Sequence, residues 1–275
     1  MFIAKDTRKI AEIVAARDEN GMGAKKFKLA RRRQEFKSGH INQLVRGSSK
    51  TRGLQAAEMV NLYNNGLSTV RGIHAFASAE NLLHLNLGCN ALKEIPPEIT
   101  QLRALRELWL DDNLFEELPT PVLELEELRV LRLSGNRLTS LPAQIRMLRL
   151  LEDLSCDANE VGDLPETVNE LVNLRNLNVR QNAISSLPEL GDLKHLEILI
   201  ASSNCLESLE TVSLEKLTSL RKLFINGNKI NEFPAKDIIA LAKDGCLDKA
   251  NFANNCLKLP LPAEIISELG DKLIV

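Results

Sequence analysis

A motif that recurs every 23 residues is the feature that most constrains the fold of this chain. The stretches LRELWLDDNLF, LRVLRLSGNRL, LEDLSCDANEV and LRNLNVRQNAI begin at Leu105, Leu128, Leu151 and Leu174, each 23 residues after the one before. They share the pattern L-x-x-L-x-L-x-x-N-x-L, with another apolar residue at some leucine positions. A fixed period of this length is the signature of stacked supersecondary units, so it determines the architecture before local propensities do.

Copies of the motif continue on both sides of this central run. They begin at Ala57, Leu82, Leu196, Leu220 and Leu247, which makes nine units in all. Each unit carries one asparagine at the same place: Asn65, Asn90, Asn113, Asn136, Asn159, Asn182, Asn204, Asn228 and Asn255. We expect these asparagines to hydrogen-bond buried backbone groups between units and to have a structural role.

The motif predicts one short strand per unit. Successive side chains alternate along a strand, so Leu108 and Leu110 should point into the core while Glu107, Trp109 and Asp111 face outward. One unit cannot bury its leucines alone, but stacked units form a continuous core beneath one parallel sheet.

The second half of the unit carries a family resemblance. It has the sequences IPPEITQL, LPTPVLEL, LPAQIRML and LPETVNEL, beginning at Ile95, Leu118, Leu141 and Leu164. With these stretches the chain resembles the leucine-rich-repeat superfamily, and it is similar to the intracellular 23-residue, Ras-suppressor-like class. The resemblance implies an α/β solenoid: a horseshoe with a parallel concave β-sheet, an irregular or short-helical convex side and, in this chain, a helical N-terminal segment.

Three regions follow from this pattern. Residues 1–56 form a basic helical N-terminal arm and cap, residues 57–259 form a solenoid of nine repeats, and residues 260–275 form a C-terminal capping helix. Within the last region Ile265, Ile266 and Leu269 recur at helical spacing. Within the first, a helix is expected over residues 25–37.

The arm has a charge of its own. Residues 1–56 contain 14 Lys and Arg against 5 Asp and Glu, a formal charge of +9, although the whole chain carries only -2. Six basic residues gather in the sequence KKFKLARRR: Lys25, Lys26, Lys28, Arg31, Arg32 and Arg33. Two interpretations remain open, a solvated or capping helix and an arm that binds nucleic acid, an anionic membrane or an acidic protein.

The sequence points to a binding protein and not to an enzyme. It contains no phosphate-binding glycine loop, no G-x-S-x-G and no H-E-x-x-H, and only His84 near Cys89 offers a conceivable nucleophilic pair. No cofactor or metal site is expected. Five cysteines without a C-x-x-C pair, no signal-peptide-like start and no transmembrane segment favour free thiols in a reducing, cytoplasmic setting, with cilium, nucleus and mitochondrion left open.

The outward strand positions define the candidate binding surface. Folding does not need aromatic side chains there, yet the only Trp and the only Tyr of the chain occupy such positions. Around Trp109 the sequence predicts an apolar anchor within a charged collar. The expected partner-binding residues on the concave face are Tyr63, His84, Glu107, Trp109, Asp111, Asp112, Arg132, Asp153, Asp157, Arg180, Ile198, Ile200 and Phe224.

Two functions are therefore expected. The first is a non-catalytic interaction module, a scaffold or signalling adaptor that binds a protein partner on its concave face. The alternative is a structural subunit of a large ribonucleoprotein or ciliary assembly, attached through the basic arm. The repeat consensus specifies a type of surface and not a ligand, so the partner is not identified by the sequence.

Overall fold

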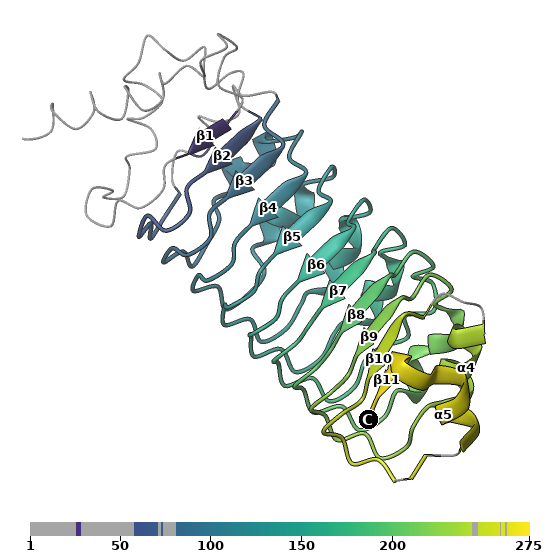
Figure 1. The fold of residues 1–275 in the computed structure, drawn as a ribbon. Helices are drawn as coiled ribbons and strands as arrows, with labels where there is room; N and C mark the ends of the chain where they lie inside the picture. The colour runs from purple at the N-terminus through teal and green to yellow at the C-terminus, as the bar shows by residue number, and fades with distance from the viewer. Residues whose placement is uncertain are drawn as a thin grey trace, which may run out of the picture. The chain divides into compact units, whose positions relative to one another are not determined.

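The computed structural model describes residues 26–28, 58–70, 73, 81–243, 247–258, 260–261 and 263–275. Its strands form one parallel sheet in which the spatial order is the chain order, from β1 to β11 (Figure 1). The expected α/β solenoid with a parallel sheet is thereby confirmed. A sheet of consecutive parallel neighbours requires each connection to return behind the sheet, which is the geometry of a repeat protein.

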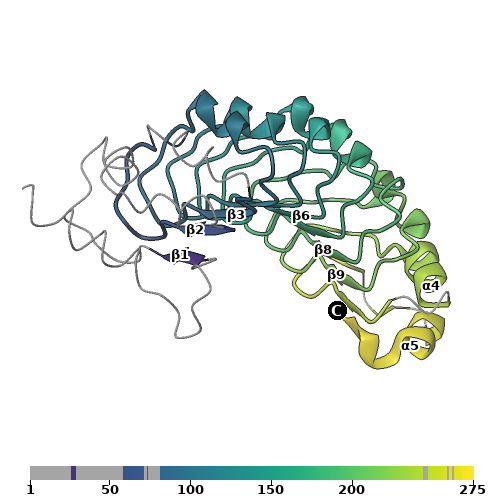
Figure 2. The ribbon, with the colours of Figure 1, turned by 90° about the horizontal axis from the view of Figure 1, so that it is seen from above.

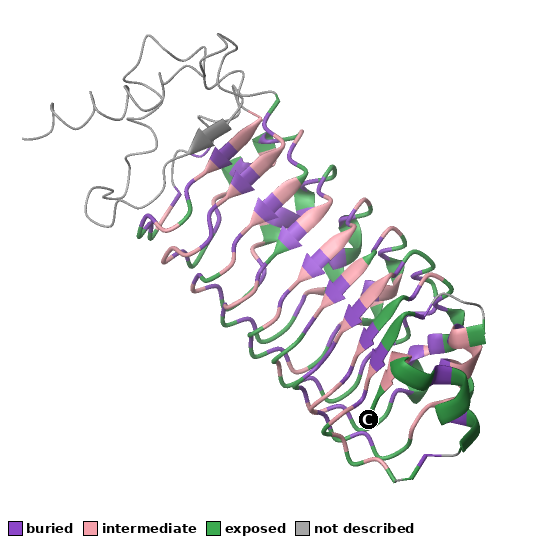
Figure 3. Cartoon of the chain, in the orientation of Figure 1, coloured by how far each residue is buried: buried purple, intermediate pink, exposed green. Residues whose placement is uncertain are grey.

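Nine of these strands coincide with the nine predicted units. They are β2 (Met59–Asn61), β3 (His84–Asn86), β4 (Glu107–Trp109), β5 (Val130–Arg132), β6 (Asp153–Ser155), β7 (Asn176–Asn178), β8 (Ile198–Ile200), β9 (Lys222–Phe224) and β10 (Lys249–Asn251). Each has three residues, and in each the middle residue is buried while the outer two are more exposed (Figure 3). The predicted alternation therefore holds in every unit.

The chain divides into two compact units, and β5 is shared between them, with Val130 and Leu131 in unit 1 and Arg132 in unit 2. Unit 1 comprises residues 1–115 and 119–131, and unit 2 comprises residues 116–118 and 132–275. In unit 1, Met59, His84 and Glu107 are register partners across β2, β3 and β4. In unit 2 the register continues from β6 through β10, with Asp153 opposite Asn176 and Ile198 opposite Lys222.

The core of each unit consists almost wholly of aliphatic side chains. Leu108 and Leu110 in unit 1, and Leu154 and Leu177 in unit 2, are fully buried. Cys156 occupies a leucine position and is also fully buried. Burial of each such side chain stabilises the fold by about 1.5 to 3 kcal/mol before the entropy cost of ordering the chain.

The recurrent asparagines connect neighbouring repeats, as expected. In unit 2 the Asn159 side chain donates from Nδ2 to the carbonyl oxygens of Leu133 at 3.0 Å and of Cys156 at 2.9 Å. Its Oδ1 accepts from the backbone N–H of Leu138 at 3.0 Å. One buried amide thus satisfies backbone groups of two repeats that water cannot reach.

A left-handed backbone residue precedes each of these asparagines. Its φ lies between 52° and 70° throughout. The residues are Asn64, Cys89, Asp112, Gly135, Ala158, Gln181, Ser203, Gly227 and Asn254. Because the chain turns sharply at this point in every repeat, even alanine and glutamine adopt a conformation that usually favours glycine or asparagine.

The return segments lie behind the strands within each unit (Figure 2). They contain short 3-10 helices, each preceded in the central repeats by a proline in extended conformation. These helices are η2 (Pro97–Gln101), η3 (Thr120–Glu124), η4 (Ala143–Met147), η5 (Glu166–Glu170), η6 (Glu210–Val212) and η7 (Leu214–Lys216). The longer return segment before β10 forms α4 (Ala235–Lys243), which buries Ile238 and Leu241.

The C-terminal residues form more than the expected helix. After α5 (Ala263–Leu269) and η8 (Gly270–Lys272), the chain adds β11 (Leu273–Ile274), which pairs with β10. In α5 the side chains of Ile265 and Leu269 are buried, but Ile266 is 56% exposed. Ile266 is therefore not part of the buried face, because it is rotated by about 100° around the helix axis from Ile265.

The N-terminal arm differs from the expected helix at the one segment that the structure describes. Residues Lys26–Lys28 form the strand β1, which pairs in parallel with β2. The helix expected over residues 25–37 is thus wrong for these three residues. Lys25, Arg31, Arg32 and Arg33, together with the rest of the arm, lie outside the described residues.

Candidate functional site: the strand face

The outward side chains of the strands form what we call the strand face of each unit. These are the first and third residues of each strand, with the residue two positions after the strand. The strand positions that the sequence predicted are confirmed for His84, Glu107, Trp109, Arg132, Asp153, Ile198, Ile200 and Phe224, which lie within strands. Tyr63, Asp111, Asp157 and Arg180 each follow a strand by two residues.

One predicted site residue occupies a different place. Asp112 follows Asp111 at the left-handed turn position, with φ 52°, and is exposed. The turn moves it off the alternation that governs the strand, so it lies at the edge of the strand face and not among the strand positions.

The strand face of unit 1 centres on Trp109. Asn86 is the register partner of Trp109, and one position earlier on the same strands His84 is the partner of Glu107. The Nδ1 atom of His84 lies 2.9 Å from Oε2 of Glu107, within ion-pairing distance of a protonated imidazole. Trp109 itself is half-buried, so its ring is held by the surrounding strands and still presents apolar surface.

Tyr63 is the most exposed of the aromatic residues whose burial the structure describes in unit 1, and a glycine makes room for it. The Tyr63 side chain is 41% exposed, and its Cδ2 atom would lie 3.3 Å from a Cβ atom added to Gly88. The ring therefore lies close above the backbone of the neighbouring strand. Gly88 is a site residue that the predicted set omits, because the repeat pattern places no requirement on its position.

Polar side chains of unit 2 hold two carboxylates in place at one end of its strand face. Oδ1 of Asp157 accepts hydrogen bonds from Oγ of Ser134 and from Nδ2 of Asn178, the latter at 2.9 Å. Oδ2 of Asp153 accepts from Nδ2 of Asn176 at 3.2 Å. Fixed carboxylates are suited to a cationic group, because little side-chain entropy remains to be lost on binding.

Apolar and basic side chains follow along the same face. Ile198 and Ile200 on β8 are register partners of Lys222 and Phe224 on β9. Both isoleucines and Phe224 are half-buried, whereas Lys222 is exposed. From β6 to β9 the first strand position of unit 2 therefore changes from acidic (Asp153) through apolar (Ile198) to basic (Lys222), while Arg180 adds a basic group two residues after β7.

The charged residues that the sequence predicts around Trp109 belong to two different units. Glu107, Asp111 and Asp112 belong to unit 1 with Trp109, whereas Arg132, Asp153 and Asp157 belong to unit 2. Arg180, the remaining predicted residue, is exposed in unit 2. The predicted set also omits Lys222, although the repeat register places it on the strand face.

Some asparagines on the strand face are structural. Asn61, Asn86, Asn178 and Asn251 each accept a hydrogen bond at Oδ1 from the backbone N–H two residues later, at 2.9 to 3.2 Å. This local hydrogen bond shapes the turn after the strand. These side chains are thus engaged before any partner arrives.

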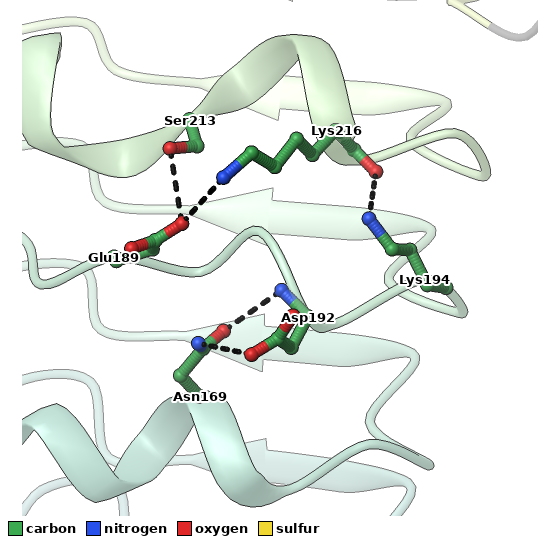
Figure 4. Close-up of polar contacts among 6 residues, drawn as sticks. All are labelled: Asn169, Glu189, Asp192, Lys194, Ser213 and Lys216. Carbon is green, nitrogen blue, oxygen red and sulfur yellow. Dashed lines mark hydrogen bonds and ion pairs between the residues drawn. The ribbon is translucent and has the colours of Figure 1, made fainter.

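A second polar cluster lies on the return segments of unit 2 (Figure 4). Glu189 Oε1 accepts from Nζ of Lys216 at 2.8 Å and from Oγ of Ser213 at 3.2 Å. The hydrogen bond from Lys216 lowers the pKa of Glu189 and, reciprocally, raises the pKa of Lys216. Because both groups are exposed, the pair connects neighbouring return segments without forming an enclosed site.

Neither a metal centre nor a membrane-spanning helix is present among the described residues. No group of three or more His, Cys, Asp or Glu side chains is placed to hold a metal ion there. None of the helices in that part of the chain combines the length and the apolar character needed to cross a bilayer.

Models of two repeat families match the chain. The model described as leucine-rich repeat region matches residues 120–241, and the model described as leucine rich repeat matches residues 55–115. With the parallel sheet and the asparagine ladder, these matches identify the chain as a leucine-rich-repeat protein. Solenoids of this kind generally act as interaction modules, because stacked repeats create extended open binding surfaces. No curated protein matches the chain.

Solved structures include similar folds. A leucine-rich-repeat protein of Leptospira interrogans superposes with a TM-score of 0.69 at 26% identity, over 98% of this chain and 74% of that one. The ectodomain of the plant membrane receptor kinase GASSHO1/SCHENGEN3 from Arabidopsis thaliana, solved with CASPARIAN STRIP INTEGRITY FACTOR 2, gives 0.67 at 26% identity. That match covers 81% of this chain but 27% of the receptor chain.

Proposed function

We propose that this chain is a non-catalytic scaffold that binds a protein partner on its strand face. The observation that carries the proposal is the presence of apolar side chains at outward strand positions, where folding does not require them: Trp109 in unit 1, and Ile198, Ile200 and Phe224 in unit 2. Interface anchors are commonly aromatic side chains surrounded by polar groups. The plant receptor that resembles this chain was solved with a partner bound, which supports the same class of function.

The predicted site residues become two anchors in this proposal. Trp109, with Tyr63, His84, Glu107, Asp111 and Asp112, forms the anchor of unit 1. Phe224, with Ile198, Ile200, Arg132, Asp153, Asp157 and Arg180, forms the anchor of unit 2. Trp109 and Phe224, the centres of the two anchors, are held on strands, so binding immobilises few additional torsions there.

Quantitative affinity capture with the full chain as bait tests the proposal. Truncation of a central interface aromatic costs about 2 kcal/mol, roughly thirtyfold in affinity. Trp109→Ala or Phe224→Ala should therefore deplete a defined set of captured proteins. Met147→Ala and Val172→Ala are matched controls, because these apolar side chains are 47% and 49% exposed on the return segments. Capture that survives both strand-face variants, or that is lost equally with the controls, would contradict the proposal.

A second candidate function is attachment to a large ribonucleoprotein or ciliary assembly through the basic arm. The charge of +9 in residues 1–56 favours it. Because Lys26 and Lys28 belong to β1, a deletion of the arm would also remove a strand that pairs with β2. Substitution of Lys25, Arg31, Arg32 and Arg33 by Gln avoids this complication.

Salt dependence separates the arm from the strand face. If the arm engages about six phosphates or other anionic groups, affinity for single-stranded RNA, anionic vesicles or an acidic peptide should fall by orders of magnitude between about 50 and 200 mM salt. The four Gln substitutions should abolish that binding. If RNA, vesicles and the acidic peptide all fail to bind at either salt concentration, the arm is not the attachment site.

A reducing, intracellular setting is part of the proposal. Cys89, Cys156, Cys205 and Cys256 are all free, which supports it. Mass spectrometry of the protein isolated from cells under non-reducing conditions should find all five cysteines as thiols. A stoichiometric disulfide would place the chain in an oxidising compartment instead.

A further inference from the structure

Two lysines meet on the strand face of unit 2. Lys222 on β9 and Lys249 on β10 are direct register partners, and both are exposed. Neighbouring strands are about 4.8 Å apart, and like charges directly opposite each other destabilise a sheet. Within the part of the chain that the structure describes, neither ammonium group forms an ion pair or a hydrogen bond. The repulsion between them is therefore not compensated by a described neighbour.

The residues at the position immediately before these lysines carry opposite charges in neighbouring repeats. There Arg221 Nε lies 2.9 Å from Asp248 Oδ2, and Arg175 Nη1 lies 2.6 Å from Glu197 Oε1. Neighbouring repeats thus carry opposite charges at one position and like charges at the next. A pair of like charges beside a charge-matched row is suited to an anionic group from outside the sheet.

An apolar surface lies beside the lysines. Phe224 is two residues after Lys222 on the same strand, and its register partner on β8 is Ile200. Both are half-buried, so they present apolar area to a partner without being part of the core. Farther along the sheet, on β6, the carboxylate of Asp153 is fixed by a hydrogen bond from Asn176.

The charged and apolar side chains of this face follow an order along the sheet. From β6 to β10 the first strand position changes from acidic to apolar to basic, over four strand spacings or about 19 Å. Arg180, two residues after β7, lies outside this order. A nucleic acid or an anionic membrane would bring negative charge to the basic end but also to Asp153 and Asp157. A polypeptide segment of mixed charge can match both ends.

We propose that the strand face of unit 2 binds a polypeptide segment in one direction, with an acidic side chain at Lys222 and Lys249, apolar side chains on Ile200 and Phe224, and a basic side chain at Asp153 and Asp157. This inference rests on the proposed function and specifies its partner. At about 3.3 Å per residue, an extended segment places its basic and acidic residues roughly six positions apart. A helix, at about 1.5 Å per residue, places them roughly 13 apart.

A displayed library of random 16-residue peptides, selected on the full chain, tests the proposal. The wild-type chain should enrich peptides that carry an acidic residue next to bulky apolar residues, with a basic residue toward the other end. The double variant Lys222→Glu, Lys249→Glu should bind these peptides at least tenfold more weakly and should enrich peptides with basic residues instead. The control Lys236→Glu, Lys243→Glu makes the same change in net charge on α4 and should leave the selection unchanged.

Melting temperature separates a binding role from a structural one. Lys249→Glu places opposite charges at the two partnered positions, so it should raise the melting temperature while it lowers peptide affinity. A lowered melting temperature together with unchanged affinity would overturn the proposal.

The library distinguishes the possible failures. If the wild-type chain enriches peptides whose binding is indifferent to both charge reversals, the directional site is wrong and the proposed function stands. If the wild-type chain enriches no peptide, the directional site is wrong, and the affinity capture with Trp109→Ala and Phe224→Ala decides the proposed function separately. Binding of single-stranded RNA or of phosphatidylserine vesicles that depends on Lys222 and Lys249 would also overturn the directional site, because the ligand would then be a polyanion.

Discussion

Arg175 Nη1 lies 2.6 Å from Glu197 Oε1, and the pair joins the residues that immediately precede β7 and β8 in neighbouring repeats. Arg175 also approaches Glu152 Oε2 at 3.9 Å, so the arginine lies between two acids. Charges of opposite sign thus recur at one repeat position along unit 2. These charged residues lie immediately before the strands, so the first outward position of each strand is occupied by other side chains.

Removal of this central arginine should have a small effect on folding. The side chains of Arg175 and Glu197 are 51% and 38% exposed, and exposed ion pairs contribute about 0 to 1 kcal/mol. We expect Arg175→Ala to lower the free energy of unfolding by less than about 1 kcal/mol in urea titrations. The effect should shrink in 1 M salt, and a loss several times larger would show that the row is a structural requirement.

Substitution of a buried asparagine of the ladder should lower the free energy of unfolding far more. Asn159→Ala removes the acceptor for the Leu138 N–H and the donor to the carbonyl groups of Leu133 and Cys156. Each buried backbone group that is left unsatisfied costs about 1 to 3 kcal/mol, so we expect a loss of about 3 kcal/mol or more. Asn173→Ala, which removes a single exposed hydrogen bond to the Arg149 carbonyl, is the matched control. Equal losses in the two variants would refute the ladder as the main polar support.

Replacement of the left-handed turn residue Ala158 by glycine should stabilise the fold. Ala158 has φ 54°, a conformation that costs an L-residue with a Cβ atom about 1 kcal/mol or more. Ala158→Gly removes that strain but adds backbone entropy to the unfolded chain, so the net gain should be a few tenths of a kcal/mol up to about 1. Ala143→Gly, at the start of η4, should instead destabilise. The comparison needs only thermal unfolding of the two variants.

The thiol of Cys156 should be inert in the native state. Burial, reinforced by the charge of Asp157, raises its pKa from 9.0 to about 12. At pH 8 the exposed Cys256 should react with a thiol reagent at once, whereas Cys156 should react only as the chain unfolds.

The same shift predicts a dependence of stability on pH. A pKa that is raised on folding favours the folded state fully below pH 9, and this contribution is lost as the pH rises from 9 toward 12. Cys156→Val, which cannot ionise, should therefore lose less stability than the wild-type chain over that range. Identical pH profiles of the two proteins would contradict the assignment.

The repeat period explains why the strands were predictable from sequence to the residue. Leu108 and its equivalents recur with the period, so alternation alone assigns the core and the strand face. β1 and β11 carry no copy of the motif, and nothing local distinguishes them from the helices expected there. The turn residue before each ladder asparagine varies from cysteine to glutamine, so composition does not reveal its conformation.

The candidate site was predictable only in its list of outward positions. Residues 27 apart in the chain, Lys222 and Lys249, become neighbours because α4 takes up the extra length on the return side. The repeat alignment predicts their adjacency, because each lysine lies two residues after the start of its unit, at Leu220 and at Leu247. The repeat register places Gly88 at an outward position, but its proximity to the Tyr63 ring requires the structure.

Site-specific photo-crosslinking tests the central claim most directly. A photoreactive phenylalanine derivative replaces either Phe224, on the strand face, or Val172, on a return segment. Each variant is irradiated together with the partner recovered by affinity capture, and the crosslinked product is quantified. The strand-face account predicts efficient crosslinking from position 224 and only background from position 172. The opposite pattern, or equal yields from the two positions, would contradict it.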